Sequence, residues 1–117
     1  MFFKQEIGKE GEDIAIRYLE KKNYLIIERN FRCRQGEIDI IALDKEELVF
    51  VEVKTRTNLS YGKPGEAVND VKKKHIKNAI EYYLYKNYIK DMYIRIDVIE
   101  VYMNGNKHKI NHIKQIV

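Results

Sequence analysis

The sequence predicts an α/β fold, in which a central mixed β-sheet carries helices on its faces. Two stretches show the three-and-four spacing of apolar residues that is typical of amphipathic helices. Five others are rich in β-branched and aromatic residues, as strands are. The expected order is helix 5–22, strand 23–30, strands 36–43 and 48–56, helix 71–87, strand 92–103 and strand 107–117. Because helices alternate with groups of strands, we expect both helices to pack on one sheet.

Length and composition are typical of one folded domain, which we expect to span residues 1–117. Hydrophobic residues make up 44% and charged residues 34%, which argues against a disordered chain. No apolar stretch approaches the roughly 18 residues of a membrane span, and no signal peptide is recognisable, so we expect no membrane partner. Cys33 is the only cysteine, which excludes a disulfide framework and fits a cytoplasmic location.

The stretch 36–56 has the clearest chemical meaning in the sequence. The polar segment Asp44–Glu47 separates two apolar runs and therefore predicts a β-hairpin. If the hairpin closes symmetrically over this turn, each outward step pairs one residue from each strand. Asp39 then lies opposite Glu52, with about 4.5–5.5 Å between their Cβ atoms.

Two facing carboxylates inside apolar strands repel each other unless a cation lies between them. Mg²⁺ accepts one or two carboxylates together with waters and phosphate oxygens. Lys54 follows Glu52 on the same face, about 6.6 Å further along the strand. This combination is typical of metal-dependent phosphodiesterases. From the residues alone, a Glu37–Lys54 ion pair with a solvated Asp39 is an equally acceptable interpretation.

The segments GEIDIIA and VFVEVKTR resemble the YraN-like family, also called UPF0102. That family resembles a branch of the PD-(D/E)XK nuclease superfamily, which includes archaeal Holliday junction resolvases. The resemblance extends to Gly8–Ala15, to 30–32 and to 62–68, although Ile38 stands where the superfamily motif has its proline. It implies a restriction-endonuclease-like fold, an endonuclease-like activity and an Mg²⁺ or Mn²⁺ cofactor. The residues implied are Asp39 and Glu52 as metal ligands and Glu12, Asp39, Glu52 and Lys54 as catalytic residues.

Glu12 lies at the edge of the apolar stripe of the first helix, where a carboxylate is able to face a site. Without the resemblance, an exposed helical glutamate is the simpler interpretation. Gly8 and Gly11 each cost this helix about 1 kcal/mol relative to alanine. Close approach of a strand or of a nucleic-acid backbone would explain them.

The net charge of +4 permits binding to nucleic acid without demonstrating it. Basic residues precede the hairpin in the expected turn 31–36, end the second hairpin strand, and occupy the loop 58–65, a candidate flap over substrate. Others lie at the start of the second helix, where the helix dipole makes positive charge unfavourable. Phosphate binding would explain why basic residues occur there. The expected phosphate contacts are Arg32, Arg34, Arg56, Lys63, Lys72, Lys73, Lys74 and Lys77. Solvated loops and simple solubility remain the alternatives.

Three other features have mainly structural interpretations. His75 is expected at the surface rather than as a ligand. For Asp97, an ion pair with Arg95 or Arg29 is as acceptable as a catalytic role. The nine tyrosines are expected in the core and at its rim, with some able to stack on bases.

Taken together, the sequence favours a metal-dependent nuclease that hydrolyses phosphodiester bonds of nucleic acid. DNA is the expected polymer, and branched or single-stranded forms are candidates. The alternative is a non-catalytic nucleic-acid-binding or scaffold module of a repair or recombination assembly that keeps the fold. The resemblance to junction resolvases also implies a possible homodimer.

Overall fold

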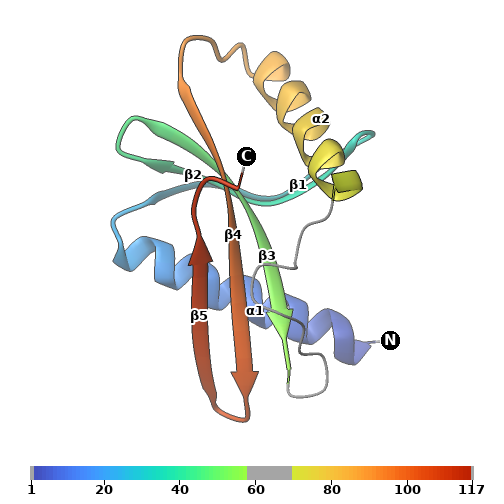
Figure 1. Ribbon diagram of the computed structural model, residues 1–117, viewed down its shortest axis with the longest axis vertical. Coiled ribbons are helices and arrows are strands. Elements are labelled where there is room, and N and C mark those ends of the chain that lie inside the picture. Colours follow the sequence, from blue (N-terminus) through green and yellow to red (C-terminus); the bar gives the residue numbers. More distant parts are fainter. Residues whose placement is uncertain (1, 58–69, 117) are drawn as a thin grey trace.

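The computed structural model describes residues 2–57 and 70–116. Two helices and five strands follow one another in the predicted order (Figure 1). They are α1 (Phe2–Lys21), β1 (Leu25–Cys33), β2 (Gly36–Asp44), β3 (Glu47–Arg56), α2 (Asp70–Lys86), β4 (Tyr93–Asn104) and β5 (Lys107–Ile113). The predicted α/β class, a mixed sheet flanked by helices, is confirmed. The arrangement is consistent with a restriction-endonuclease-like fold.

The five strands form one sheet in the order β1-β2-β3-β4-β5. Strands β3 and β4 are parallel, and the other neighbours are antiparallel. A parallel pair requires a crossover connection. The chain between β3 and β4 contains α2, which therefore returns across the sheet to the β1–β2 end of the molecule.

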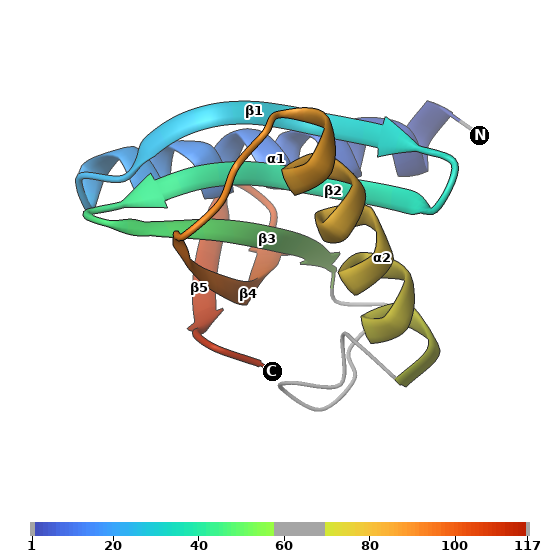
Figure 2. The ribbon, with the colours of Figure 1, turned by 90° about the horizontal axis from the view of Figure 1, so that it is seen from above.

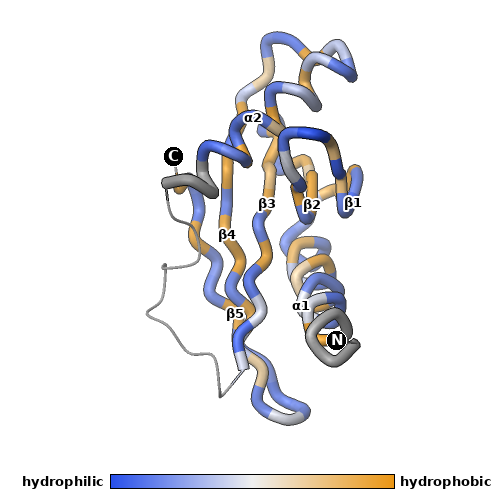
Figure 3. Tube along the Cα trace, turned by 90° about the vertical axis from the view of Figure 1, so that its right-hand side faces the viewer, coloured by the Kyte–Doolittle hydropathy of each residue, from blue (hydrophilic) through white to orange (hydrophobic). Residues whose placement is uncertain are grey.

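The two helices cover opposite faces of the sheet. Val49 and Val51 of β3 pack in one buried cluster with α1, whereas Leu48 and Phe50 pack in another with α2. Successive side chains of a strand point to opposite faces, so the two clusters lie on the two sides. Figure 2 shows α1 running along β1 and β2 while α2 crosses the strand direction. The apolar segments in Figure 3 follow β2, β3 and β4, where both clusters meet the sheet.

The predicted register of the central hairpin is confirmed where its strands pair. Asp44 faces Glu47, and the ladder continues outward to Ile40 opposite Val51. Asp39 and Glu52 are the next residues outward, just beyond the last pair of the ladder.

The ladder between β2 and β3 ends at this point, so the Glu37–Lys54 pair predicted as the alternative does not belong to it. Glu37 instead lies opposite Arg32 of β1, with 3.7 Å between Oε2 and the arginine Nε.

Three element boundaries differ from the predictions by at least three residues. The expected turn 31–36 is shorter, because β1 continues to Cys33. Phe31 is buried there, with its ring centroid 5.1 Å from that of Tyr83, and this packing holds the segment in the sheet. The first helix already includes Phe2, and the last strand ends at Ile113. The loop 58–65, with Lys63, lies outside the described residues.

The helices do not have the character of membrane spans. In the ranges 2–57 and 70–116, no helix is long and apolar enough to cross a membrane.

Candidate active site

A small cavity opens at the end of the central hairpin where β2 and β3 leave their ladder. Its volume is about 250 Å³. The described residues that line it are Glu37, Asp39, Glu52, His75 and Ile76. Asp39 and Glu52 therefore face the same space from neighbouring strands, on the side of the sheet that α2 covers. This is the convergence that the hairpin register predicts.

The end of the ladder itself orients Asp39. Its Oδ2 accepts a hydrogen bond of 2.8 Å from the backbone N–H of Val53. The backbone ladder between β2 and β3 has already ended here, so the Asp39 side chain, rather than a backbone carbonyl of β2, accepts the N–H of Val53. The carboxylate is thereby held against β3, directly beside Glu52, whose side chain is buried.

Burial and neighbouring charge raise the pKa of Asp39 from 3.8 to about 8. Loss of water is the largest cause, and the charge of Glu52 is the next. Glu12 and Glu37 add to the effect, and the Val53 hydrogen bond opposes it. The site is therefore strongly unfavourable for two negative charges without a counter-ion.

Gly11 brings Glu12 of α1 toward this end of the sheet. A Cβ atom on Gly11 would overlap Oγ1 of Thr55, so the glycine permits α1 to approach β3 closely. Of the two predicted explanations, close approach of a strand holds for Gly11 but not for Gly8, where an added Cβ would meet nothing within 4 Å. The Glu12 carboxylate is close enough to influence Asp39, but it also lies 3.5 Å from Nη2 of Arg29. Burial raises the pKa of Glu12 despite that arginine.

Lys54 is half-buried on β3, two residues beyond Glu52. It is not among the described residues that line the cavity. Its backbone is paired with that of Glu100 on β4. The sequence predicts that Lys54 lies beside the two carboxylates. In the structure, Lys54 is not among the described residues that line their cavity.

The donor set fits a hard divalent cation with few protein ligands. In the part of the chain that the structure describes, no three carboxylate, imidazole or thiol groups converge to hold one ion. Among the residues that line the cavity, Asp39 and Glu52 are the pair of carboxylates that act most strongly on each other, and they are the candidate donors. Mg²⁺ is bound in this manner, with waters and phosphate oxygens completing its shell.

The residues expected to contact phosphate differ in their exposure to solvent. Arg32, Arg34, Lys74 and Lys77 are exposed. The expectation for Arg56 is wrong, because its side chain is buried and its Nε lies 3.1 Å from Oε2 of Glu100. Lys63 and the side chains of Lys72 and Lys73 lie outside the described residues.

His75 is the cavity residue that sequence reasoning missed. It is exposed, as expected, but it also lines the cavity, and its Nδ1 lies 3.4 Å from the carbonyl oxygen of Gln35. A Cβ on Gly36 would lie 3.5 Å from the His75 carbonyl oxygen, so α2 approaches the β1–β2 turn closely. The contact joins segments about forty residues apart, and no local pattern announces it.

Asp97 belongs to a separate buried network on the α1 side of the sheet. Arg95 donates to its two oxygens at 2.9 and 3.0 Å, and Nε2 of His112 lies 2.8 Å away. Of the two predicted ion pairs, the one with Arg95 is therefore present. Arg29 instead lies 2.9 Å from Asp13.

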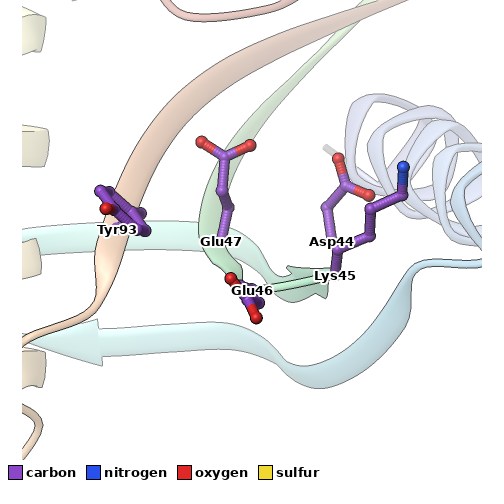
Figure 4. A pocket seen from close by; sticks show the side chains of 5 residues that line it. All are labelled: Asp44, Lys45, Glu46, Glu47 and Tyr93. Atoms are coloured by element: carbon purple, nitrogen blue, oxygen red, sulfur yellow. The ribbon is translucent and has the colours of Figure 1, made fainter.

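A second, wider pocket of about 550 Å³ surrounds the opposite end of the hairpin (Figure 4). Asp44, Lys45, Glu46, Glu47 and Tyr93 line it. Asp44 and Glu47 hold Nη1 of Arg95 at 3.0 and 2.9 Å. These two carboxylates are thus part of the Arg95 network and share that arginine as their ion-pair partner.

The fold and the cavity define an α/β protein with two converging carboxylates on its central hairpin. The chain belongs to the uncharacterised protein family UPF0102, whose model matches residues 11–101. A UPF0102 protein of Caldanaerobacter subterraneus is 48% identical over 113 residues, which cover 94% of this chain and 93% of the relative. A UPF0102 protein of Geobacter metallireducens is 47% identical over 109 residues, covering 93% and 89%. One of Clostridium perfringens is 43% identical over 114 residues, covering 96% and 93%.

Proposed function

We propose that this protein is a metal-dependent nuclease that hydrolyses phosphodiester bonds of DNA, with Mg²⁺ or Mn²⁺ held by Asp39 and Glu52. The observation that carries the proposal is the small cavity lined by both carboxylates at the end of the hairpin. When bound there, such an ion would lower the pKa of an attacking water and neutralise charge on the phosphate. The resemblance to PD-(D/E)XK nucleases through Asp39, Glu52 and Lys54 supports the same chemistry.

Neighbouring groups of the protein orient the Asp39 carboxylate and shield the Glu52 carboxylate from water. The Val53 N–H fixes one oxygen of Asp39, so the carboxylate keeps its position before any cation arrives. Burial of Glu52 strengthens its attraction for a cation, because little water screens the charge. Lys54 would place positive charge near the phosphate as negative charge develops. Glu12 would hold a water or a second ion from the α1 side.

A second candidate is a nucleic-acid-binding or scaffold module that has kept the fold without turnover. The observation in its favour is that Arg29 already engages Glu12 and that Lys54 lies outside the cavity. Both candidates share the exposed basic residues, so binding alone does not separate them.

Cleavage assays with matched variants test the proposal. Labelled single strands, duplexes, flaps and junctions would be incubated with Mg²⁺, Mn²⁺ or EDTA. Wild type should cleave at least one substrate only with metal, and Asp39→Asn and Glu52→Gln should abolish both cleavage and metal binding by calorimetry. Glu46→Gln is the control, because Glu46 is an exposed acid at the far end of the hairpin.

Cleavage that survives both site substitutions would refute the proposed site. Nucleic-acid binding without cleavage of any substrate, together with no calorimetric signal for Mg²⁺ or Mn²⁺, would establish the second candidate.

A further inference from the structure

One side of α2 forms an aromatic stripe that begins at the candidate site. We use this name for His75, Asn78, Tyr82 and Tyr85, which follow each other at three- and four-residue spacing and therefore lie along one side of the helix. His75 lines the cavity of Asp39 and Glu52. From His75 to Tyr85 the helix rises roughly 15 Å, so the stripe leads from the cavity across the surface.

Both tyrosines of the stripe are exposed to solvent. Tyr85 is 81% exposed and Tyr82 is 37% exposed. Tyr82 also packs against Phe31, with 6.3 Å between ring centroids, so part of its ring is anchored and part faces water. An aromatic ring left in water is a surface that a stacking partner is able to cover.

The buried side of α2 holds the stripe in position. Ile76, Ala79, Ile80 and Tyr83 are all buried against the sheet, which fixes the rotation of the helix about its axis. Tyr83 contacts the rings of both Phe31 and Phe50, at 5.1 and 5.7 Å between centroids. The helix backbone that carries the exposed rings therefore needs little ordering when a ligand binds, which favours affinity.

The excess of positive charge around the stripe favours a negatively charged partner. Between residues 74 and 90 the sequence has lysines at 74, 77, 86 and 90 and a single acid, Glu81. Lys74 and Lys77 are exposed beside the end of the stripe that lies near the cavity. Lysines interleaved with exposed aromatic rings are typical of surfaces that bind single-stranded nucleic acid.

We propose that the aromatic stripe binds single-stranded nucleic acid and leads an unpaired strand to the Asp39–Glu52 cavity. Bases stack on Tyr82 and Tyr85, and Lys74 and Lys77 contact the backbone phosphates. In a duplex the base faces are covered by their neighbours, so only unpaired bases offer a free surface to these rings. The second half of this statement, delivery to the cavity, rests on the proposed function, whereas binding by the stripe does not.

Fluorescence anisotropy in EDTA tests the binding separately from any cleavage. The probes are a labelled oligothymidylate, an oligouridylate of equal length and a duplex of equal length. Wild type should bind both single strands more tightly than the duplex. Tyr85→Ala should weaken single-strand binding roughly tenfold, as expected for the loss of one stacked base.

Two controls identify the ring as the cause. Tyr85→Phe keeps the stacking surface and should bind as wild type does. Tyr93→Ala removes another tyrosine, 74% exposed but next to the acidic hairpin end, and should also bind normally. Unchanged melting temperatures would show that each variant is folded.

Several outcomes would overturn the inference. Equal affinity of Tyr85→Ala and wild type for the single strands, or tighter binding of the duplex, would each do so. So would sedimentation that shows Tyr85→Ala dissociating a wild-type dimer, because the rings would then belong to a protein interface. Single-strand binding without cleavage of any substrate would support binding by the stripe and refute both the proposed enzyme and delivery to its cavity. Cleavage of single strands that is unaffected by Tyr85→Ala would refute delivery by the stripe and leave the proposed enzyme standing.

Discussion

Asp39 occupies the point where backbone pairing between β2 and β3 stops, and its side chain accepts the Val53 N–H there. The hydrogen bond explains why a carboxylate is found beside Glu52 although their charges repel. Burial and repulsion together raise the pKa of Asp39 to about 8. A proton or a cation relieves the repulsion, so occupancy of this site and stability of the fold are coupled.

We predict that Asp39→Asn, measured in EDTA at pH 8, is at least as stable as wild type. Asparagine still accepts the Val53 N–H but carries no charge. Because folding raises the pKa of Asp39 from 3.8, ionised Asp39 destabilises the folded state increasingly as pH rises from about 4 to about 8. A pKa difference of one between the folded and unfolded states corresponds to about 1.4 kcal/mol, so the variant should gain one to a few kcal/mol in unfolding free energy at pH 8.

The same denaturation curves with Mg²⁺ complete the test. Saturating metal should stabilise wild type, by about 2.7 kcal/mol at a hundredfold excess over Kd, and should leave Asp39→Asn unchanged. A variant that is clearly less stable than wild type in EDTA would instead indicate that Asp39 has a structural ion-pair role.

At the scale of single elements, α1 approaches β3 closely at one point, and β4 carries two buried polar networks. The close contact is between Gly11 and Thr55. On β4, Asp97 bonds to Arg95 and His112, while Glu100 bonds to Arg56 and Asn111. Asp97 and Glu100 are both fully buried, so removing a partner leaves a charge uncompensated.

The two glycines of α1 give a matched pair of substitutions. Gly8→Ala should raise the unfolding free energy by about 0.5–1 kcal/mol, because nothing lies near the added methyl group and alanine favours the helix. Gly11→Ala should lower it by about 1–3 kcal/mol, because the methyl group meets Thr55. Urea denaturation of both variants measures the difference, and equal effects would show that the contact with β3 is unimportant.

Asp97 should make a pH-dependent contribution to stability. Burial alone would raise its pKa, but hydrogen bonds from His112, Arg95 and the Gln115 backbone outweigh burial and lower it below 3.8. Its contribution is therefore complete above about pH 5 and is lost as pH falls through 3.8 toward the lower folded pKa.

Urea denaturation between pH 7 and pH 3 measures this contribution as the difference between wild type and Asp97→Asn. We expect a difference of about 3–5 kcal/mol at pH 7 that narrows in acid. A difference that stays constant with pH would mean that ionisation of Asp97 does not matter.

At the scale of the whole molecule, the crossover through α2 joins the hairpin to a basic helix. The β3–α2–β4 connection places β4 beside β3, and α2 returns to the β1–β2 turn near Gly36. His75 and Ile76 of α2 thus line the same cavity as the two carboxylates although they are far apart in sequence, and the exposed Lys74 and Lys77 lie next to them along the helix. Phosphate binding by this helix is the expected consequence.

Neutralising Lys74 and Lys77 together should weaken nucleic-acid binding to a similar extent for all sequences. The slope of log affinity against log salt should fall by roughly 1.4–1.8, because two phosphate contacts are lost. Anisotropy at several salt concentrations measures this, with Lys107→Ala as the control, because Lys107 is exposed at the start of β5. An unchanged slope would assign both lysines to solubility.

Features that depend on neighbouring residues were predictable from the sequence. The polar segment Asp44–Glu47 and the apolar residues on both sides define the hairpin and its register. This register directs Asp39 and Glu52 to the same cavity. Apolar spacing defines both helices, and the strand and helix order defines the α/β class. These patterns are local because turn formation and side-chain alternation act over a few residues.

Only the tertiary structure decided which polar groups are buried together. Arg56 resembles a phosphate contact in the sequence, yet parallel pairing of β3 with β4 buries it against Glu100. His75 resembles a surface residue, yet the packing of α2 places it in the cavity with Asp39. By itself, the sequence determined the fold class, the hairpin and its pair of acids. The partners of Arg56, Asp97 and His75 depended on long-range packing, because local periodicity carries no information about contacts between distant segments.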